Sequence, residues 1–333
     1  MTIQSIVLAA GQGTRMRSKY AKVLHQILGK PIVWYAVAAA REASGSKPIL
    51  VVGHQADDVR QAMGDLVTYV VQEPQLGTGH AVLQTRSELR GGTDLILVTY
   101  ADMPLLTSQS LRGIIEAQQS HTGPMTMLTI VGGDSRGFGR VVRDDMHNIR
   151  EIIEEAHATP EQRAIKELNP SIFCFQAGWL WETLDQIHPS PKGEYYLTDT
   201  IGIATSQGLH VQAFTIDNNP EMIGINTRIH LAEAETAMRQ RINEHWLLAG
   251  VTMLDPNTTY IEPEVTIGTD TILESNTVLR GKTSIGKECN LGPNIILLNA
   301  QVGDRCKVIA SMLENVTIPE GSKIGPFQHH KGR

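Results

Sequence analysis

Short aliphatic runs alternate with amphipathic stretches through the first two-thirds of the chain. The apolar runs predict strands at residues 5–10, 48–53, 67–72 and 94–102. Apolar positions with helical spacing predict helices at residues 31–43, 56–66 and 77–89. Strands that alternate with helices of roughly 10–15 residues indicate βαβ units and a mainly parallel sheet. Ligands bind at the carboxyl ends of such strands, so LAAG, VVG and VTYAD are expected at one edge of the sheet.

The pattern loosens after residue 120 and then becomes helical. Mixed strands are predicted in PMTMLTIVGG, FGRVVRDD and SIFCFQAGWL. One long helix is predicted next, in INTRIHLAEAETAMRQRINEHWLLAG, where Gly250 provides a C-cap. Its apolar positions are three or four residues apart: Leu231, Ala234, Met238, Ile242, Trp246 and Ala249.

A six-residue period begins at Ile267. Aliphatic residues recur at every sixth position, at Leu273, Leu279, Ile285, Leu291 and Leu297. Two positions before each member of this series, Ile267 included, lie small or β-branched residues: Val265, Thr271, Thr277, Thr283, Cys289 and Ile295. The register slips near Val302 and resumes at Ile318 and Ile324. This period is typical of a hexapeptide β-helix, and the alternative is a chance alternation of polar strands. Because a short solenoid has open ends and a flat face, we expect it to need partner chains.

Three segments are therefore predicted, in an α/β fold class. Residues 1–226 form an α/β domain with a mixed, mostly parallel sheet, and residues 227–250 form a linker helix. Residues 251–333 form a short left-handed parallel β-helix.

Charge is distributed unevenly, although the net charge is −6. Residues 1–41 contain six Lys or Arg and no Asp or Glu, which indicates a local anion site. The negative balance and the 5% aromatic content disfavour nucleic-acid binding. No apolar run reaches about 18 residues, so no membrane span is expected, and the N-terminus lacks the features of a signal peptide. Three scattered cysteines, Cys174, Cys289 and Cys306, favour reduced thiols and a cytoplasmic protein.

The segment LAAGQGTR follows the first predicted strand and favours phosphate binding. Its two glycines let backbone amides approach a phosphate, and Arg15 and Lys22 add positive charge. It is not a Walker loop, since no GK[ST] follows, and not a dinucleotide fingerprint, since the third glycine is missing. A tight turn with solvated Arg and Lys is the alternative.

Asp102 ends the predicted strand LVTYAD at the same edge of the sheet. Mg²⁺ between this carboxylate and substrate phosphates is expected there, unless Asp102 only caps a following segment. Gln72 suits the edge of a nucleotide base, while Gly77 and Gly79 at a helix start are equally explained by a turn. No residue has the pattern of a covalent nucleophile. Such a site favours phosphoryl chemistry by positioning and charge neutralisation.

The segment LAAGQGTRMRSKYAKVLHQILGKP resembles the signature of the sugar-1-phosphate nucleotidyltransferases. QLGTGHA, GFGR, GEYYLTD and the hexapeptide tail narrow the resemblance to the bifunctional N-acetylglucosamine-1-phosphate uridylyltransferase/glucosamine-1-phosphate acetyltransferases. The match runs in order over nearly the whole chain. It implies a Rossmann-like nucleotidyltransferase domain, Mg²⁺ as cofactor, a homotrimer formed through the β-helix, and a role in peptidoglycan and cell-wall synthesis.

The resemblance also implies roles for individual residues. UTP would lie on the backbone of Leu8, Ala9, Ala10 and Gly11, with Arg15 and Lys22 as catalytic residues on its triphosphate. The uracil would contact Gln72, Gly77 and Thr78, and Tyr100 and Ala101 would line the site. N-acetylglucosamine-1-phosphate would contact Gly139, Glu154, Asn169 and Thr198. Asp102, which is also expected to be a catalytic residue, and Asn226 would hold the metal. Without the family, Glu154 and Asn169 would be ordinary surface residues.

Three departures from the family pattern are present. Ala101 stands in place of Gly, and no lysine occurs in Glu154-Glu155-Ala156-His157. Asn169-Pro170-Ser171 replaces Asn, then Thr or Ser, then Gly. Proline removes an amide donor and restricts φ, so the sugar pocket is expected to differ. The family's acetyl-transfer residues lie on coils beyond IGPF, so acetyl transfer is not expected of this chain.

The expected reaction is uridylyl transfer. A phosphate oxygen of N-acetylglucosamine-1-phosphate attacks the α-phosphorus of UTP in line, giving UDP-N-acetylglucosamine and pyrophosphate. No general base is needed, because a sugar phosphate is already anionic at neutral pH. The alternatives are a nucleotidyltransferase for another nucleotide or hexose-1-phosphate, a catalytically silent regulatory subunit, and a hexapeptide acyltransferase. The presence of Arg15, Lys22, Asp102 and Asn226 together disfavours the silent subunit.

Overall fold

The chain forms two compact units in the computed structural model, which describes residues 1–89, 91–132, 135–217 and 220–332. The first unit combines Met1–His25 with Pro31–Leu231, and the second combines Gln26–Lys30 with Ala232–Arg333. The domain boundaries at residues 226 and 250 stay predictions. Among the described residues, no helix is long and apolar enough to cross a membrane.

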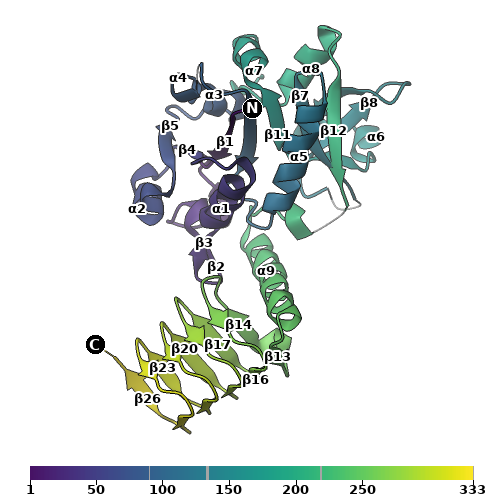
Figure 1. Cartoon of the computed structure of the whole chain (residues 1–333). Helices are drawn as coiled ribbons and strands as arrows, with labels where there is room; N and C mark the ends of the chain where they lie inside the picture. Colours follow the sequence, from purple (N-terminus) through teal and green to yellow (C-terminus); the bar gives the residue numbers. More distant parts are fainter. Residues whose placement is uncertain (90, 133–134, 218–219, 333) are drawn as a thin grey trace. The chain divides into compact units, whose positions relative to one another are not determined.

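A ten-stranded mixed sheet forms the centre of the first unit, in the order β5-β4-β1-β6-β11-β7-β10-β8-β9, with β12 paired to β7 (Figure 1). Its parallel, Rossmann-like part consists of β1 (Ile3–Leu8), β4 (Ile49–Val52), β5 (Thr68–Val71) and β6 (Leu95–Tyr100). The other part consists of β7 (Met125–Val131), β8 (Gly139–Arg143), β9 (Ile149–Ile153), β10 (Glu167–Asn169), β11 (Phe173–Gln176) and β12 (Val211–Ile216). All pairs in this second part are antiparallel except β7 with β12. The predicted α/β fold with a mixed sheet is confirmed.

Two groups of helices pack on this sheet. The first group is α1 (Ile32–Ser44) and α5 (Ser108–Ser120), which contact each other. The second is α3 (Thr78–Leu83), α7 (Ala177–Leu184) and α8 (Asp199–Ser206). Three further helices lie in this unit: α2 (Ala56–Met63), α4 (Arg86–Leu89) and α6 (Pro160–Arg163).

Two sequence predictions in this unit are wrong in detail. The helix predicted at residues 77–89 is divided between α3 and α4, where the Thr85 hydroxyl donates to the Val82 carbonyl. The strand predicted to run through SIFCFQAGWL ends at Gln176, and AGWL begins α7. This segment is helical because Ala177, Leu180 and Leu184 recur with helical spacing and are all buried.

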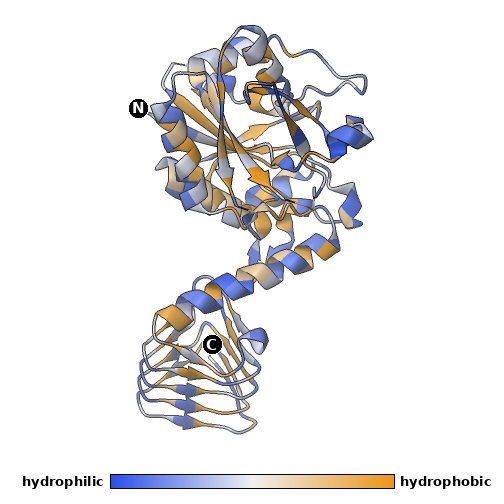
Figure 2. Ribbon diagram, turned by 90° about the vertical axis from the view of Figure 1, so that its right-hand side faces the viewer, coloured by the Kyte–Doolittle hydropathy of each residue, from blue (hydrophilic) through white to orange (hydrophobic). Residues whose placement is uncertain are grey.

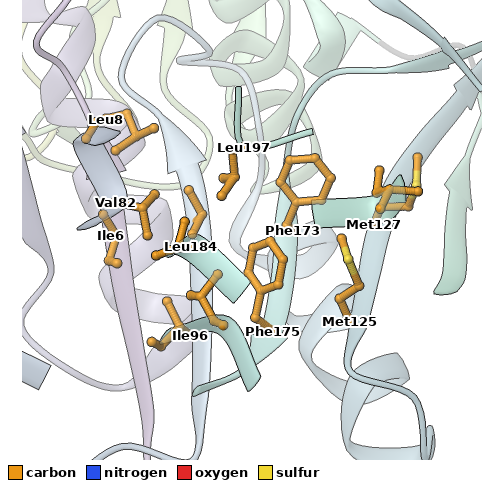
Figure 3. Packing of buried hydrophobic residues seen from close by; sticks show 14 of the residues in the cluster. Ile6, Leu8, Val82, Ile96, Met125, Met127, Phe173, Phe175, Leu184 and Leu197 are labelled. Carbon is orange, nitrogen blue, oxygen red and sulfur yellow. The ribbon is translucent and has the colours of Figure 1, made fainter. Parts of the chain in front are cut away.

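One cluster of the core lies between the sheet and α3, α7 and α8. Alternation along β1 directs Ile6 and Leu8 into this cluster. Figure 3 shows Phe173 and Phe175 of β11 between Ile96 of β6 and the methionines of β7. Because β11 joins the parallel and antiparallel parts, its aromatic side chains fill the core at their junction.

Three sheets of short parallel strands form the second unit (Figure 1). The first sheet contains β13 (Thr252–Met253), β16 (Ile272–Leu273), β19 (Asn290–Leu291), β22 (Lys307–Val308) and β25 (Lys323–Ile324). The second contains β14 (Thr259–Ile261), β17 (Thr277–Arg280), β20 (Ile295–Leu298), β23 (Met312–Glu314) and β26 (His329–Lys331). The third contains β15 (Thr266–Ile267), β18 (Ser284–Ile285), β21 (Gln301–Val302) and β24 (Thr317–Ile318).

The six-residue period corresponds to the inward side of each strand, and the predicted β-helix is confirmed. Every aliphatic residue of the period from Ile267 to Leu297 is buried, and Figure 2 shows hydrophobic segments, in orange, recurring from coil to coil. The predicted register slip is confirmed, because the next member of the series after Leu297 is Val302, five positions later. Five-residue steps recur from Val308 to Leu313 and on to Ile318.

The predicted long helix is α9 (Arg228–Leu248). A hairpin of β2 (Gln26–Ile27) and β3 (Lys30–Pro31) packs beside it, and the backbone N–H of Leu28 donates to Glu235 of α9 at 3.0 Å. At the tip, Gly29 has a φ of 76°, and a Cβ there would lie 2.3 Å from the Glu262 carboxyl group. The positive φ favours glycine, and a side chain there would also have to displace the Glu262 carboxyl group.

Candidate active site

A cavity of about 470 Å³ lies at the carboxyl ends of β1, β5 and β6. Ten of the predicted site residues line it: Leu8, Ala9, Ala10, Gly11, Lys22, Gln72, Gly77, Thr78, Tyr100 and Asp102. Five further lining residues were not singled out from the sequence: Gln12, Val23, Gln75, Ala81 and Glu194. All five lie in or beside the quoted motifs, so membership of a motif was the available signal.

The loop after β1 brings Lys22 into this cavity. Gly13 has a φ of 63°, and a Cβ there would lie 2.5 Å from the Cβ of Lys22. The loop can therefore fold against Lys22 only with glycine at this position. Met16, which is buried, anchors the 3-10 turn Thr14–Met16 between the two residues.

Four predicted residues form one polar cluster, which we call the Lys22 cluster: Arg15, Lys22, Asp102 and Asn226. The Lys22 ammonium lies 2.5 Å from Asp102 Oδ2 and 3.3 Å from Asn226 Oδ1. Arg15 donates to the same Asn226 oxygen at 2.9 Å. The Asp102 carbonyl accepts the N–H of Ile225 at 2.8 Å, which holds the segment before Asn226 against the end of β6. Thr107 caps α5, so the alternative role of Asp102 as the cap of that helix is not observed.

The Lys22 cluster fits a magnesium ion by its chemistry. Its carboxylate and amide oxygens are the hard donors that Mg²⁺ prefers, and both already face one positive charge, the Lys22 ammonium. The described residues contain no group of three or more His, Cys, Asp or Glu side chains placed to hold a metal. Water and substrate phosphates would therefore complete the coordination, as is usual for Mg²⁺ at phosphate sites.

Two motifs that both contribute lining residues to the cavity are joined by backbone hydrogen bonds. The N–H of Gly79 donates to the Tyr195 carbonyl, and the N–H of Tyr195 donates to the Leu76 carbonyl, both at 2.8 Å. Gly77 has a φ of 97°, and a Cβ there would lie 2.6 Å from the Tyr195 carbonyl oxygen. The Thr78 hydroxyl accepts the N–H of Leu197 at 2.9 Å. These hydrogen bonds hold the segment GEYYLTD against the segment QLGTGHA.

A third group holds the residues expected to contact the sugar. The Thr198 hydroxyl donates to Glu154 at 3.0 Å, and Gly139 pairs with Asn169 between β8 and β10. Burial raises the pKa of the Tyr100 hydroxyl, and the nearby carboxylates of Glu154 and Asp102 raise it further. Tyr100 is therefore electrostatically linked to both this group and the Lys22 cluster. Ala101 is buried, and its N–H donates to the Leu8 carbonyl at 3.0 Å.

Asn169 presents a donor without a partner in the described part of the chain. Its side chain is 1% exposed, its Oδ1 accepts the N–H of Ser171 at 2.9 Å, and its Nδ2 has no hydrogen-bond partner there. Ser171 has a φ of 65°, a conformation that favours glycine. The Pro170 departure therefore leaves the Asn169 amide held by Ser171, with its nitrogen available to an acceptor on a ligand.

Arg140 of GFGR orders the segment that carries Glu154. Its guanidinium is 2% exposed and lies 2.6 Å from the carboxylate of Glu155. It also donates to the carbonyls of Phe138 and Arg163. A buried guanidinium with these partners ties β8 to the residues on either side of it.

Glu154→Gln is expected to stabilise the fold at high pH. Burial raises the pKa of Glu154 above its ordinary value, so the folded protein binds this proton more tightly than the unfolded chain. Between the two pKa values the folded state carries more protons, and its stability falls as the pH rises through that window. The glutamine keeps the shape and can still accept from Thr198. Thermal unfolding should give a higher Tm for the variant at about pH 8 and an equal Tm near pH 4.

Glu151→Gln, at a half-exposed position on β9, is the matched control for that measurement and should change the free energy of unfolding by less than about 0.5 kcal/mol. A Tm increase of equal size at both pH values would contradict the burial argument.

Comparison with known proteins identifies the family. Residues 5–194 match the MobA-like NTP transferase domain. The chain is 40% identical over 326 residues to the bifunctional protein GlmU of Limosilactobacillus reuteri, an alignment that covers 98% of this chain and 72% of that protein. GlmU of an Exiguobacterium species is 41% identical over 326 residues, with the same coverage. GlmU of Acetivibrio thermocellus is 40% identical over 328 residues, covering 98% of this chain and 71% of that protein.

A solved structure shares the fold. It is a Bacillus anthracis protein provisionally assigned as a glucose-1-phosphate thymidylyltransferase. It superposes with a TM-score of 0.58 at 20% identity, over 70% of this chain and 94% of that chain. Since the GlmU relatives match almost the whole sequence described above, this chain belongs to the GlmU family, and its first unit carries a nucleotidyltransferase domain.

Proposed function

We propose that the chain is a uridylyltransferase that makes UDP-N-acetylglucosamine and pyrophosphate from UTP and N-acetylglucosamine-1-phosphate. The observation that carries the proposal is one cavity whose lining includes Gln72 and Gly77 as well as Lys22 and Asp102 of the Lys22 cluster. A nucleoside triphosphate needs both kinds of group, an amide for its base and charged side chains for its phosphates. Membership of the GlmU family, with its NTP transferase domain, supports a nucleotidyltransferase activity of this kind.

In this mechanism the chain positions two anions and neutralises their charge. Arg15 and Lys22 would face the departing pyrophosphate, since Lys22 can turn from Asp102 to a phosphate on its flexible stem. Mg²⁺ on Asp102 and Asn226 would add positive charge beside the phosphates. The attacking sugar phosphate is anionic at neutral pH, so the chain has no proton to remove. Alignment of the two substrates then accounts for most of the rate enhancement.

The sugar would lie beside Tyr100, Glu154, Asn169 and Thr198. The buried Asn169 Nδ2 can donate to a sugar oxygen or to the carbonyl of an N-acetyl group. The Glu154 carboxylate can accept from a sugar hydroxyl or an amide N–H. A donor and an acceptor at these positions suit an N-acetylated amino sugar.

The decisive experiment is pyrophosphate release from UTP, with and without N-acetylglucosamine-1-phosphate and Mg²⁺. Release that requires all three components supports the proposal. Faster release with dTTP or GTP, or with another hexose-1-phosphate, would assign a different transferase of the same class. Nucleotide binding without release would instead indicate a regulatory subunit, and consumption of acetyl-CoA would indicate an acyltransferase.

We further propose that the chain forms a homotrimer through the β-helix. In four successive strands of the second sheet, β14, β17, β20 and β23, the outward residues of one register are apolar: Tyr260, Val278, Ile296 and Met312. The fifth strand, β26, has His329 in this register. Tyr260 is 38% exposed and Ile296 is 37% exposed. A continuous apolar column on a sheet surface favours contact with another chain.

Ile296→Glu is expected to dissociate this assembly. The substitution puts a charge in the middle of the apolar column, where burial against a partner would cost several kcal/mol. Lys307→Glu, at an outward position of the neighbouring sheet, is the matched control and should leave the assembly intact. Sedimentation velocity measures both. A wild-type monomer, or an Ile296→Glu variant that still forms trimers, would contradict the proposal.

A further inference from the structure

The orientation of the Gln72 side-chain amide is determined by its neighbours. One of its terminal atoms lies 2.8 Å from the carbonyl oxygen of Gly77. A carbonyl oxygen only accepts hydrogen bonds, so the atom beside it must be the amide nitrogen, Nε2. The Gln72 oxygen therefore points away from Gly77.

His80 provides the second partner of the same nitrogen. Its Nδ1 lies 3.1 Å from Gln72 Nε2, and its other ring nitrogen lies 3.1 Å from the Gln84 amide group. Burial lowers the pKa of His80 below its ordinary value, so the ring is neutral at neutral pH. Since Gln72 Nε2 is a donor, Nδ1 must accept and the ring proton must lie on Nε2. The Gln84 amide must then turn its oxygen to the ring, so that this oxygen accepts the proton on His80 Nε2. In that orientation Gln84 loses the 3.3 Å hydrogen bond from its own Nε2 to the His80 carbonyl.

Both hydrogens of Gln72 Nε2 are then engaged, one by Gly77 and one by His80. The group that remains for a ligand is the Gln72 oxygen, which only accepts. Gln72 lines the cavity where the proposed function puts the base.

We propose that His80 is a positioning residue that holds Gln72 as an acceptor and so selects a pyrimidine that carries a hydrogen on N3. This inference rests on the proposed function, which puts a pyrimidine nucleotide in this cavity. Uracil and thymine carry a hydrogen on N3 and can donate to the Gln72 oxygen. Cytosine carries a lone pair instead of a hydrogen on N3. Its N3 and the Gln72 oxygen are therefore both acceptors and cannot form a hydrogen bond with each other. Selection between UTP and CTP thus depends on a residue that need not touch the nucleotide.

Three substitutions of His80 separate this role from a structural one. The oxygen of asparagine can occupy the place of Nδ1, the amide of glutamine reaches the place of Nε2 instead, and phenylalanine has no acceptor at either place. The measurement is kcat/KM for UTP and for CTP, at saturating N-acetylglucosamine-1-phosphate. We expect His80→Phe and His80→Gln to reduce the UTP/CTP ratio about tenfold, the contribution of one hydrogen bond, and His80→Asn to retain it within about threefold. The KM for the sugar phosphate should not change.

An unchanged UTP/CTP ratio in His80→Gln would overturn the inference. An equal loss of selectivity in the asparagine and glutamine variants would also overturn it, because a packing defect has no preference for the Nδ1 position. If the phenylalanine variant does not fold, the asparagine and glutamine variants are enough to test the inference. The wild-type protein distinguishes the two proposals: failure to use UTP contradicts the proposed function, whereas normal use of UTP with unaltered selectivity in the variants contradicts only the role of His80.

Discussion

Asp102→Ala is expected to reduce pyrophosphate release from UTP by about a hundredfold or more, a loss of ~3 kcal/mol in transition-state stabilisation. Asp102 is the carboxylate of the Lys22 cluster, and its Oδ2 lies 2.5 Å from the Lys22 ammonium. Without it, the amide oxygen of Asn226 is the one remaining protein ligand proposed for Mg²⁺. The initial rate should be measured over a range of Mg²⁺ concentrations, because excess metal should recover little activity.

Asp57→Ala is the control for this experiment, since Asp57 is 96% exposed on α2 and pairs with Arg60 three residues away. Its activity should match that of the parent. Thermal unfolding should show that Asp102→Ala remains folded. Activity of Asp102→Ala within threefold of the parent would exclude Asp102 from the catalytic machinery.

Arg140→Met is expected to lower the free energy of unfolding by about 2 kcal/mol or more, because it removes a buried guanidinium that pairs with the partly exposed Glu155 and donates to two carbonyls. Methionine retains much of the aliphatic volume, so the loss reports the guanidinium rather than a cavity. Urea unfolding of the two proteins measures the difference.

Arg143→Met is a matched control on the same strand. Arg143 makes two hydrogen bonds of 2.7 Å to Glu167, but its side chain is 31% exposed. Water can therefore replace much of that interaction, and the expected loss is about 1 kcal/mol. Equal losses in the two variants would show that burial of Arg140 adds nothing to its effect.

The fold was predictable where one local rule determines a whole segment. The six-residue period identified the inward residues of the β-helix, since each coil repeats the same burial pattern. The spacing of three and four residues identified α9, which runs from Arg228 to Leu248. Strand ends were predictable as well, and LAAG and VTYAD do meet, with the N–H of Ala101 donating to the Leu8 carbonyl.

The missed features depend on contacts between segments that are far apart in the sequence. Gln26–Lys30 has no pattern that indicates its contacts with α9 and Glu262, more than 200 residues away. His80 was visible in QLGTGHA, but its role requires the positions of Gln72 and Gln84 around one ring. The orientation of the Asn169 amide likewise follows from the turn at Ser171, which local propensity does not predict.

The hairpin Gln26–Lys30 determines how the protein can be dissected. The chain passes between its two compact units three times, after His25, after Lys30 and after Leu231. A single protease cut within α9 would therefore not release two separate pieces, because the first fragment keeps its hairpin strands in the second unit. An isolated nucleotidyltransferase domain needs a second alteration: a short turn in place of the hairpin, so that Leu28 is not left without its partners on α9.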